Sequence, residues 1–332
     1  MAMNGSKVLL AAVPPLESDR HGCYSKLSTG LRIYEGSIDA IHVTDVRVED
    51  DVKRKRDSPR VPQMEFARQV REWVPDKNLI LYRVVVHEGR DGHLKWMEEA
   101  RALGVNTIVL VGGDRSDKTY QGLDLSQASE LARQEGFDYG GIIIPTRRSD
   151  PALVPEEILR RRVRPARVDE VDRVRKKIGY GLSGFFTQIL YESEGINRLL
   201  TDLVNAGVRV PRLFLSFSPA MSAEDIDFHA KLGAYVPEGV RRQLEGAWKM
   251  DKASAVLAVE LWRDVSEHCR NLGLPEDVLG VNVEYVNIRT MERTMKMIDE
   301  FGRWVRPRRR ENVSNMPAEV RKNPEDPYAL SL

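Results

Sequence analysis

The chain of 332 residues has few cysteines, almost no net charge and no long hydrophobic run. Its two cysteines, Cys23 and Cys269, lie far apart, which excludes a disulfide framework and a cysteine-based zinc site. A net charge of +1 excludes a global field that would favour nucleic acid or an anionic membrane. The apolar run before Pro14 is too short for a signal-peptide core, and nothing elsewhere approaches a membrane span. We therefore expect a soluble, cytoplasmic protein with neither nucleic acid nor a membrane as partner.

Short β-rich runs alternate with helical patterns along the whole chain. Several of the runs are almost continuously apolar, which is typical of strands buried on both faces. Eight strand–helix repeats predict parallel pairing in a closed α/β structure, the (β/α)8 TIM barrel. A doubly wound open sheet is the alternative. The expected strands are 7–13, 38–44, 79–86, 106–112, 139–144, 184–190, 212–218 and 280–286.

Two segments depart from the simple repeat. Residues 236–272 contain two successive helical patterns, which predict extra helices between strands seven and eight. Past Trp304 the chain becomes rich in Arg, Asn and Pro. We expect a barrel over 1–304 and an extended C-terminal tail over 305–332, with the RPRRR run as a solvated basic segment rather than a nucleic-acid patch.

The sequence GYGLSG at 179–184 matches a dinucleotide-binding pattern. That motif works as a turn that leaves a strand and opens a helix, so that a phosphate meets the helix N-terminus. Here the order is reversed, because a helical pattern precedes the glycines and an expected strand follows them. The motif is therefore expected on the stability face of the barrel and not at a nucleotide site.

Chemistry in a (β/α)8 barrel gathers where strands end, and several polar residues occupy such places. Asp114 follows two glycines after the fourth strand, and its carboxylate suits the amidine-like edge of a pterin. A turn aspartate that caps its own loop is the alternative. Gln188 lies among apolar residues of the sixth strand, where a buried amide needs a polar partner. The expected second strand ends at Thr44, and Asp45 follows it.

At these positions the chain resembles the methylenetetrahydrofolate reductases over most of residues 7–303. The resemblance is carried by AVPPLESD, GVNTIVLVGGD, GGIIIPTRRSDPA, RKKIGYGLSGFFTQ, the segment around SPAMS, and EYVNIR, in that order along the chain. The family implies a folate-binding barrel. Its pterin-binding aspartate and glutamine correspond to Asp114 and Gln188, and its flavin-phosphate lysine corresponds to Lys177. Its asparagine–arginine pair after the last strand is similar to Asn287 and Arg289.

Other positions depart from the family pattern. The family's general acid, three residues before the double proline, corresponds to Ala11, and the arginine before its glycine–aspartate pair corresponds to Gly112. Its flavin-contacting histidine corresponds to Arg83, and a tyrosine-like position corresponds to Ile144. The residues that recognise the pterin are thus retained, whereas the flavin contacts differ from the family pattern and the general acid is missing.

Three functions are compatible with this pattern. The first is an oxidoreductase that reduces 5,10-methylenetetrahydrofolate by direct hydride transfer from NADH or NADPH, with FAD as the less favoured cofactor. Asp45, Glu49 or Glu17 would then supply the proton. A positioned general acid typically raises the reaction rate by about 10²–10⁴-fold. The second is methyl transfer at N5 of tetrahydrofolate, which needs no ring opening. The third is a non-catalytic folate-binding subunit. The sequence allows either a homo-oligomer or a complex with a partner subunit.

The candidate site residues form three groups. The catalytic candidates are Asp114, Asp45 and Glu17. The substrate-binding candidates are Asp114, Gln188, Thr44, Ser218, Asn287 and Arg289. The cofactor-binding candidates are Lys177 and Arg83, and no metal site is expected.

Overall fold

Eight parallel strands close into a barrel in the computed structural model, which describes residues 8–46, 58–113, 120–146, 169–285 and 288–305. Each strand pairs with the next along the chain, and β8 pairs with β1. The (β/α)8 barrel expected from the sequence is confirmed. The strands are β1 Val8–Ala12, β2 Ala40–Val43, β3 Asn78–Val84, β4 Thr107–Val111, β5 Asp138–Ile143, β6 Gly184–Ile189, β7 Arg212–Phe217 and β8 Leu279–Glu284.

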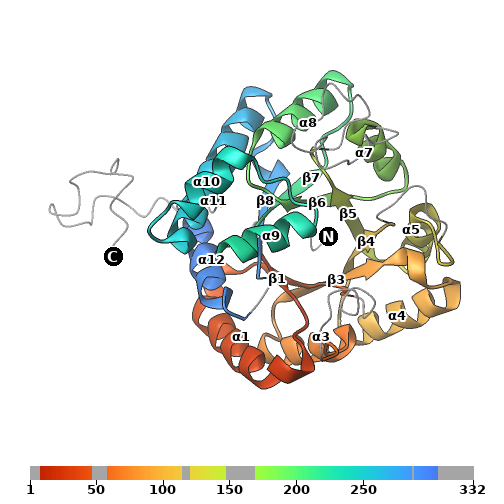
Figure 1. The fold of residues 1–332 in the computed structure, drawn as a ribbon. Helices are drawn as coiled ribbons and strands as arrows, with labels where there is room; N and C mark the ends of the chain where they lie inside the picture. The colour runs from red at the N-terminus through yellow and green to blue at the C-terminus, as the bar shows by residue number, and fades with distance from the viewer. Residues whose placement is uncertain (1–7, 47–57, 114–119, 147–168, 286–287, 306–332) are drawn as a thin grey trace, which may run out of the picture.

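Helices surround the barrel (Figure 1). They are α1 Arg20–Tyr34, α3 Gln63–Trp73, α4 Arg90–Ala102, α5 Leu125–Gln134, α7 Glu170–Gly179, α8 Glu194–Asn205, α9 Ala223–Lys231, α10 Glu238–Glu245, α11 Met250–Asn271 and α12 Met291–Val305. Helix α5 begins with a capping box, since the Asp124 side chain accepts from the backbone N–H of Gln127 and the Gln127 side chain accepts from the backbone N–H of Asp124. Local sequence therefore sets the start of this helix.

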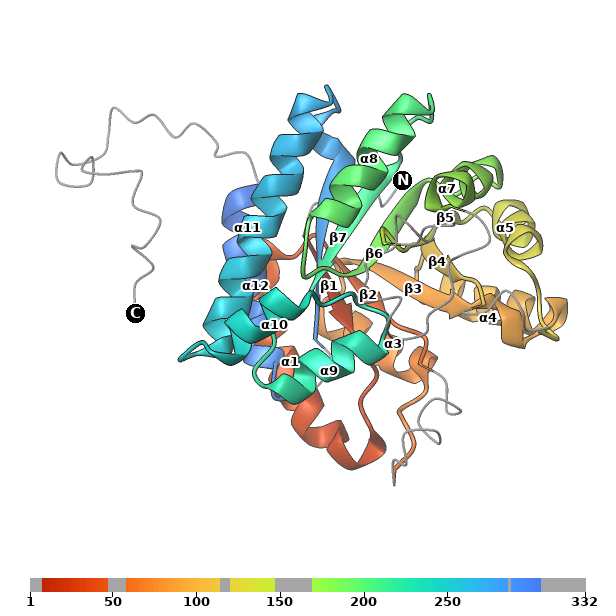
Figure 2. The same cartoon turned by 45° about the horizontal axis from the view of Figure 1, so that its top comes forward.

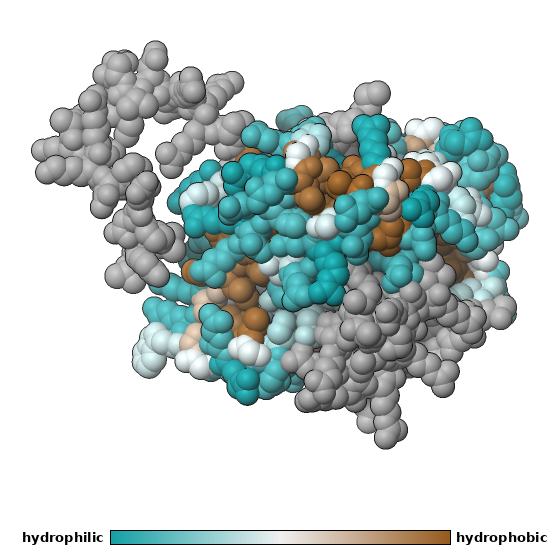
Figure 3. Space-filling view, turned by 90° about the horizontal axis from the view of Figure 1, so that it is seen from above, coloured by the Kyte–Doolittle hydropathy of each residue, from teal (hydrophilic) through white to brown (hydrophobic). Residues whose placement is uncertain are grey.

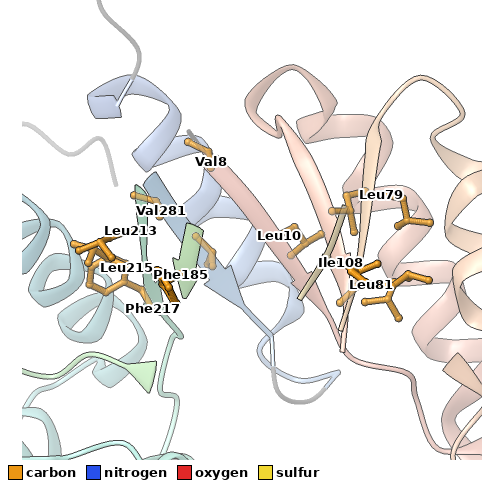
Figure 4. Close-up of a cluster of buried hydrophobic side chains, with 14 of the residues drawn as sticks. Val8, Leu10, Leu79, Leu81, Ile108, Phe185, Leu213, Leu215, Phe217 and Val281 are labelled. Atoms are coloured by element: carbon orange, nitrogen blue, oxygen red, sulfur yellow. The ribbon is translucent and has the colours of Figure 1, made fainter. Parts of the chain in front are cut away.

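The strands are apolar on both faces because each face is covered. Outward side chains such as Leu10, Leu81 and Leu215 pack in the layer between barrel and helices (Figure 4). Inward side chains, among them Leu9, Ile80 and Phe214, form a separate apolar cluster inside the barrel. This double burial explains the continuous hydrophobic runs of the sequence.

The two extra helices expected over 236–272 are confirmed as α10 and α11, and a third helix, α9, precedes them after β7. The additional helix α9 lies across the carboxyl-terminal end of the barrel rather than alongside it (Figures 1 and 2). Buried residues of the α9–α10 segment, including Ile226 and Val236, pack against Ile189 and Tyr191 at the end of β6. Helix α9 is short and polar, so its sequence has no strong helical periodicity of apolar residues. Its position depends on these contacts.

The surface seen in Figure 3 is mostly hydrophilic, with separate apolar patches. No helix within the described ranges is both long and apolar enough to cross a membrane. The GYGLSG segment lies where the sequence order predicted, between the end of α7 and the start of β6. Gly181 has a φ of +92°, a conformation that favours glycine, and so the motif serves a helix-to-strand turn.

Candidate functional site at the carboxyl end of the barrel

The barrel interior changes from apolar to polar along its axis. Toward the carboxyl ends of the strands the inward positions carry His42, Tyr82, Ser216, Asn282 and Glu284. The carboxyl face is where (β/α)8 barrels carry their chemistry, whereas the opposite face serves stability. We take this polar set as the centre of the candidate site.

Glu284 is the last residue of β8 and is half-buried. Asn282 Nδ2 donates to Glu284 Oε1 at 2.9 Å and to Ser216 Oγ at 2.9 Å. Burial raises the pKa of Glu284 from 4.5 to about 7, although hydrogen bonds from Ser216 and Asn282 oppose the rise. A carboxyl group with this pKa can both give and take a proton near neutral pH.

Ala11 lies between two polar neighbours at one level of the barrel. Its Cα is paired with that of His42 on β2 and with that of Glu284 on β8. Side chains of partner residues in neighbouring parallel strands point to the same face of a sheet. Ala11, at the position where the family that this chain resembles has its general acid, therefore lies directly beside Glu284.

His42 is buried and contacts aromatic rings. Its ring centroid lies 4.5 Å from that of Tyr82 and 5.4 Å from that of Phe186. Burial lowers the pKa of His42 from 6.5 to about 3, so the imidazole is neutral at physiological pH. Neither ring nitrogen has a hydrogen-bond partner within the described ranges. Burial, and then the charge of Glu284, raise the pKa of Tyr82 well above 10.

Gln188 lies in a bulge of β6. The register with β7 changes from Phe186 opposite Phe214 to Ile189 opposite Ser216, which leaves one extra residue in β6. Thr187 Oγ1 accepts the Ser216 amide at 2.9 Å, so the bulge is fastened by a side chain. Bulges re-aim side chains near functional sites.

The half-buried side-chain amide of Gln188 lies near the connection between α9 and α10. A Cβ atom at Gly233 would lie 3.8 Å from both Cδ and Nε2 of Gln188, and the φ of Gly233 is +100°. No residue in the described ranges gives the Gln188 amide a hydrogen bond. An amide held in this way has donors and an acceptor available for a ligand.

Two hydroxyl groups expected in the site also lie at strand ends. Thr44 follows β2 and Ser218 follows β7. The hydroxyl oxygens of both are buried, and neither has a hydrogen-bond partner in the part of the chain that is described. Both stay predicted substrate-binding residues.

A second polar cluster lies where α9 meets the barrel. The Tyr191 hydroxyl and His229 Nδ1 are 2.6 Å apart. Burial lowers the pKa of His229 to about 4, so its ring is neutral at physiological pH and shares one hydrogen bond with the tyrosine. Asp225 Oδ2 accepts the Met221 amide at 3.0 Å, and Arg289 lies 3.7 Å from Asp225 Oδ1. Arg289 is thus a largely exposed residue beside the α9 end of the site.

Asp45 and Arg83 are engaged by protein groups. Asp45 Oδ2 accepts the Val84 amide at 2.9 Å and lies 4.0 Å from Arg83 Nη1. Arg83 also pairs with Glu88, and its guanidinium lies 5.2 Å from the Trp96 ring centroid. Arg83 therefore contacts the helix layer, where Trp96 of α4 packs.

Lys177 and Glu17 have protein partners as well. Lys177 Nζ donates to the Ile142 carbonyl and lies 3.8 Å from Glu170. Glu17 forms an ion pair with Arg20 at 3.2 Å, and about a third of its side chain is exposed (35%). Asp114, Asn287 and Glu49 lie outside the described residues.

Sequence reasoning missed Glu284, Asn282 and His42. A signal was present, because Asn282 and Glu284 alternate with valines in the expected strand 280–286. Alternating polar residues on a strand that is otherwise apolar indicate a polar interior. Among the described residues no group of three or more His, Cys, Asp and Glu side chains could hold a metal ion.

The fold and this polar interior define a (β/α)8 barrel with a candidate site at the carboxyl ends of its strands. No family model and no curated protein matches the chain. A solved structure from Clostridium thermocellum, described as an uncharacterized protein that binds two copies of 5-methyl-5,6,7,8-tetrahydrofolic acid, has the same fold. It aligns with a TM-score of 0.65 and 19% identity over 91% of this chain and 96% of that one.

Two other solved structures align less well. A structure from Aquifex aeolicus VF5 gives a TM-score of 0.47 and 10% identity over 92% of this chain and 95% of that one. A Rhizobium etli pyruvate carboxylase gives 0.42 and 12% over 82% of this chain and 25% of that one. Of these three structures, the Clostridium thermocellum protein is the one that bears on the fold.

Proposed function

We propose that this protein binds a reduced folate at the carboxyl end of the barrel and reduces 5,10-methylenetetrahydrofolate to 5-methyltetrahydrofolate with NADH or NADPH. The observation that carries the proposal is the Gln188 amide, which lies in a fastened bulge without a hydrogen-bond partner in the described ranges. The structural neighbour that binds 5-methyltetrahydrofolic acid supports the ligand class.

Ligand recognition would use paired donors and acceptors. The 2-amino-pyrimidinone edge of a pterin presents both, and so an amide such as that of Gln188 can bind it through two hydrogen bonds. Asp114 is the predicted carboxylate partner for the same edge. Thr44 and Ser218 add hydroxyl groups at neighbouring strand ends.

Direct hydride transfer from the nicotinamide is favoured over a flavin intermediate. Lys177 and Arg83, the two predicted flavin contacts, are occupied by the Ile142 carbonyl and by Glu88. A residue engaged in this way would have to break a protein contact to hold a cofactor. The visible spectrum of the purified protein checks this part, since flavin absorbance would contradict direct transfer.

Reduction is favoured over methyl transfer at N5 because the site contains a titratable carboxyl group, Glu284. Opening the five-membered ring of the methylene folate requires protonation of N10, whereas methyl transfer at N5 does not. The methyltransferase remains the second candidate. It would be supported by folate binding without oxidation of NADH or NADPH in the presence of methylenetetrahydrofolate.

Replacing Gln188 tests the folate site. Gln188→Leu keeps the size of the side chain and removes its hydrogen bonds, so affinity for 5-methyltetrahydrofolate should fall about 10- to 100-fold, as loss of one or two hydrogen bonds implies. Calorimetric titration measures the affinity. Gln243→Leu on the surface helix α10 is the matched control and should bind as the wild type does. Equal affinity of Gln188→Leu and wild type would contradict the proposed site.

A further inference from the structure

Glu284 stands where a proton is needed, one strand away from the position that lacks an acid. The Cα atoms of Ala11 and Glu284 are register partners on β1 and β8. Neighbouring strands lie about 4.8 Å apart, a distance that the side chain of a glutamate can span. A carboxyl group on β8 can therefore reach the space beside Ala11 that a longer residue on β1 would fill.

The surroundings of Glu284 suit a proton donor rather than a structural ion pair. Asn282 Nδ2 donates to the Glu284 carboxyl and to Ser216 Oγ, and no described cation pairs with the carboxyl. Tyr82 and His42 face it from β3 and β2, and both are neutral at physiological pH. The carboxyl is half-buried, so the protein shields most of it from bulk water while part of the side chain stays exposed.

We infer that Glu284 is the general acid of this barrel, in a role transferred from β1 to the adjacent position on β8. This inference rests on the proposed reductase function. In the reaction the Glu284 carboxyl gives its proton to N10 of the methylene folate, and the bond between the methylene carbon and N10 breaks. The resulting iminium carbon accepts a hydride from NADH or NADPH, which leaves as NAD⁺ or NADP⁺, and solvent reprotonates the Glu284 carboxylate.

The test compares Glu284→Gln, Glu284→Ala and the transposed double variant Ala11→Glu/Glu284→Ala. Glu284→Gln should lower kcat by about 10²–10⁴-fold, the usual contribution of a positioned acid. Its affinity for 5-methyltetrahydrofolate should stay within about threefold of wild type, since the amide keeps the shape and one acceptor of the carboxyl. The double variant should regain at least about tenfold in kcat over Glu284→Ala, because it restores a carboxyl one strand away.

The pH profile separates a proton donor from a structural residue. In the wild type, kcat should decrease as the pH rises past the Glu284 pKa of about 7, because the donor loses its proton. This limb should disappear in Glu284→Gln. Glu300→Gln on α12 is the matched control, since Glu300 is another half-buried glutamate whose pKa is raised by burial. Its kcat and pH profile should equal those of the wild type.

The outcomes distinguish failure of the reductase function from failure of the Glu284 assignment. Absence of NADH and NADPH oxidation in the wild type overturns the proposed function and, with it, this assignment. Turnover in the wild type that persists in folded Glu284→Gln overturns the assignment alone. Loss of activity in Glu284→Gln without any recovery in a folded double variant shows that the position on β8 cannot be exchanged with β1, and overturns the transfer.

Discussion

Two layers inside the same barrel differ in how well the protein meets the packing and hydrogen-bonding needs of their side chains. The apolar layer contains Leu9, Ile80 and Phe214, all without solvent exposure and in mutual packing. The layer toward the carboxyl ends contains His42, whose two nitrogens have no partner in the described ranges, and Glu284, whose pKa is raised by burial. The first arrangement lowers the free energy of the fold, whereas the second raises it.

This difference separates stability from function along one axis. Burying an apolar side chain stabilises a protein by about 1.5–3 kcal/mol, while an unsatisfied buried polar group costs about 1–3 kcal/mol. A fold keeps such groups where a ligand can satisfy them. The carboxyl layer therefore carries the candidate site, and the apolar layer carries the barrel. Three variants test this difference between the two layers.

Phe214→Ala should give the largest effect. Phe214 is fully buried, and its ring stacks on Phe186 at 4.8 Å. Removing it leaves a cavity that the barrel cannot close, and the free energy of unfolding should fall by about 3–5 kcal/mol. Urea denaturation measures the change. Ile33→Ala, at a residue that is 66% exposed, is the control and should change stability by less than about 0.5 kcal/mol. A similar loss in both variants would contradict the importance of the apolar layer.

His42→Phe should make the protein more resistant to acid. The His42 pKa is about 3 in the folded protein and 6.5 otherwise, so the unfolded chain binds the extra proton and stability decreases as the pH falls from 6.5 toward 3. Between about pH 7.5 and about pH 4 this single group accounts for about 3 kcal/mol. The free energy of unfolding of His42→Phe should decline by that much less over the same range. An unchanged decline would mean that the imidazole is protonated in the folded protein.

Glu284→Gln should have the opposite pH dependence and a slightly smaller effect. The folded pKa of Glu284, about 7, exceeds the ordinary 4.5, so the folded protein binds the extra proton and stability decreases as the pH rises from 4.5 through 7. The neutral glutamine should therefore stabilise the protein by about 2–3 kcal/mol more at about pH 8 than at about pH 5. Thermal unfolding at both pH values checks the difference. An equal effect at the two pH values would show that Glu284 titrates as an exposed acid does.

Much of the barrel could be predicted from the sequence, because its strands are buried on both faces. The runs around Leu9, Ile108 and Leu213 are recognisable as strands without knowledge of their neighbours. The cap at Asp124 is similarly local. Helix α9 was missed because it is short and is held by contacts with Ile189 and Tyr191, which lie far away in the sequence.

The candidate site was only partly predictable. Gln188 stood out because an amide among apolar residues is unusual, but the β6 bulge that aims it depends on pairing with β7. Asp45 and Glu17 were reasonable acids by their position after strands, yet the structure engages one with Val84 and the other with Arg20. A one-dimensional pattern does not show which carboxylates are already bound by other groups.

The amino-acid sequence alone is enough to establish the barrel, the absence of an acid at position 11 and the presence of Gln188 in the sixth strand. Tertiary structure makes neighbours of Ala11 and Glu284, which are 273 positions apart, because barrel closure pairs the first strand with the last. It also decided the protonation of Glu284, since a carboxyl pKa depends on burial and on the groups around it. The fold follows from the pattern of apolar residues along the sequence, whereas the chemistry of the site follows from which strands pair in the closed barrel.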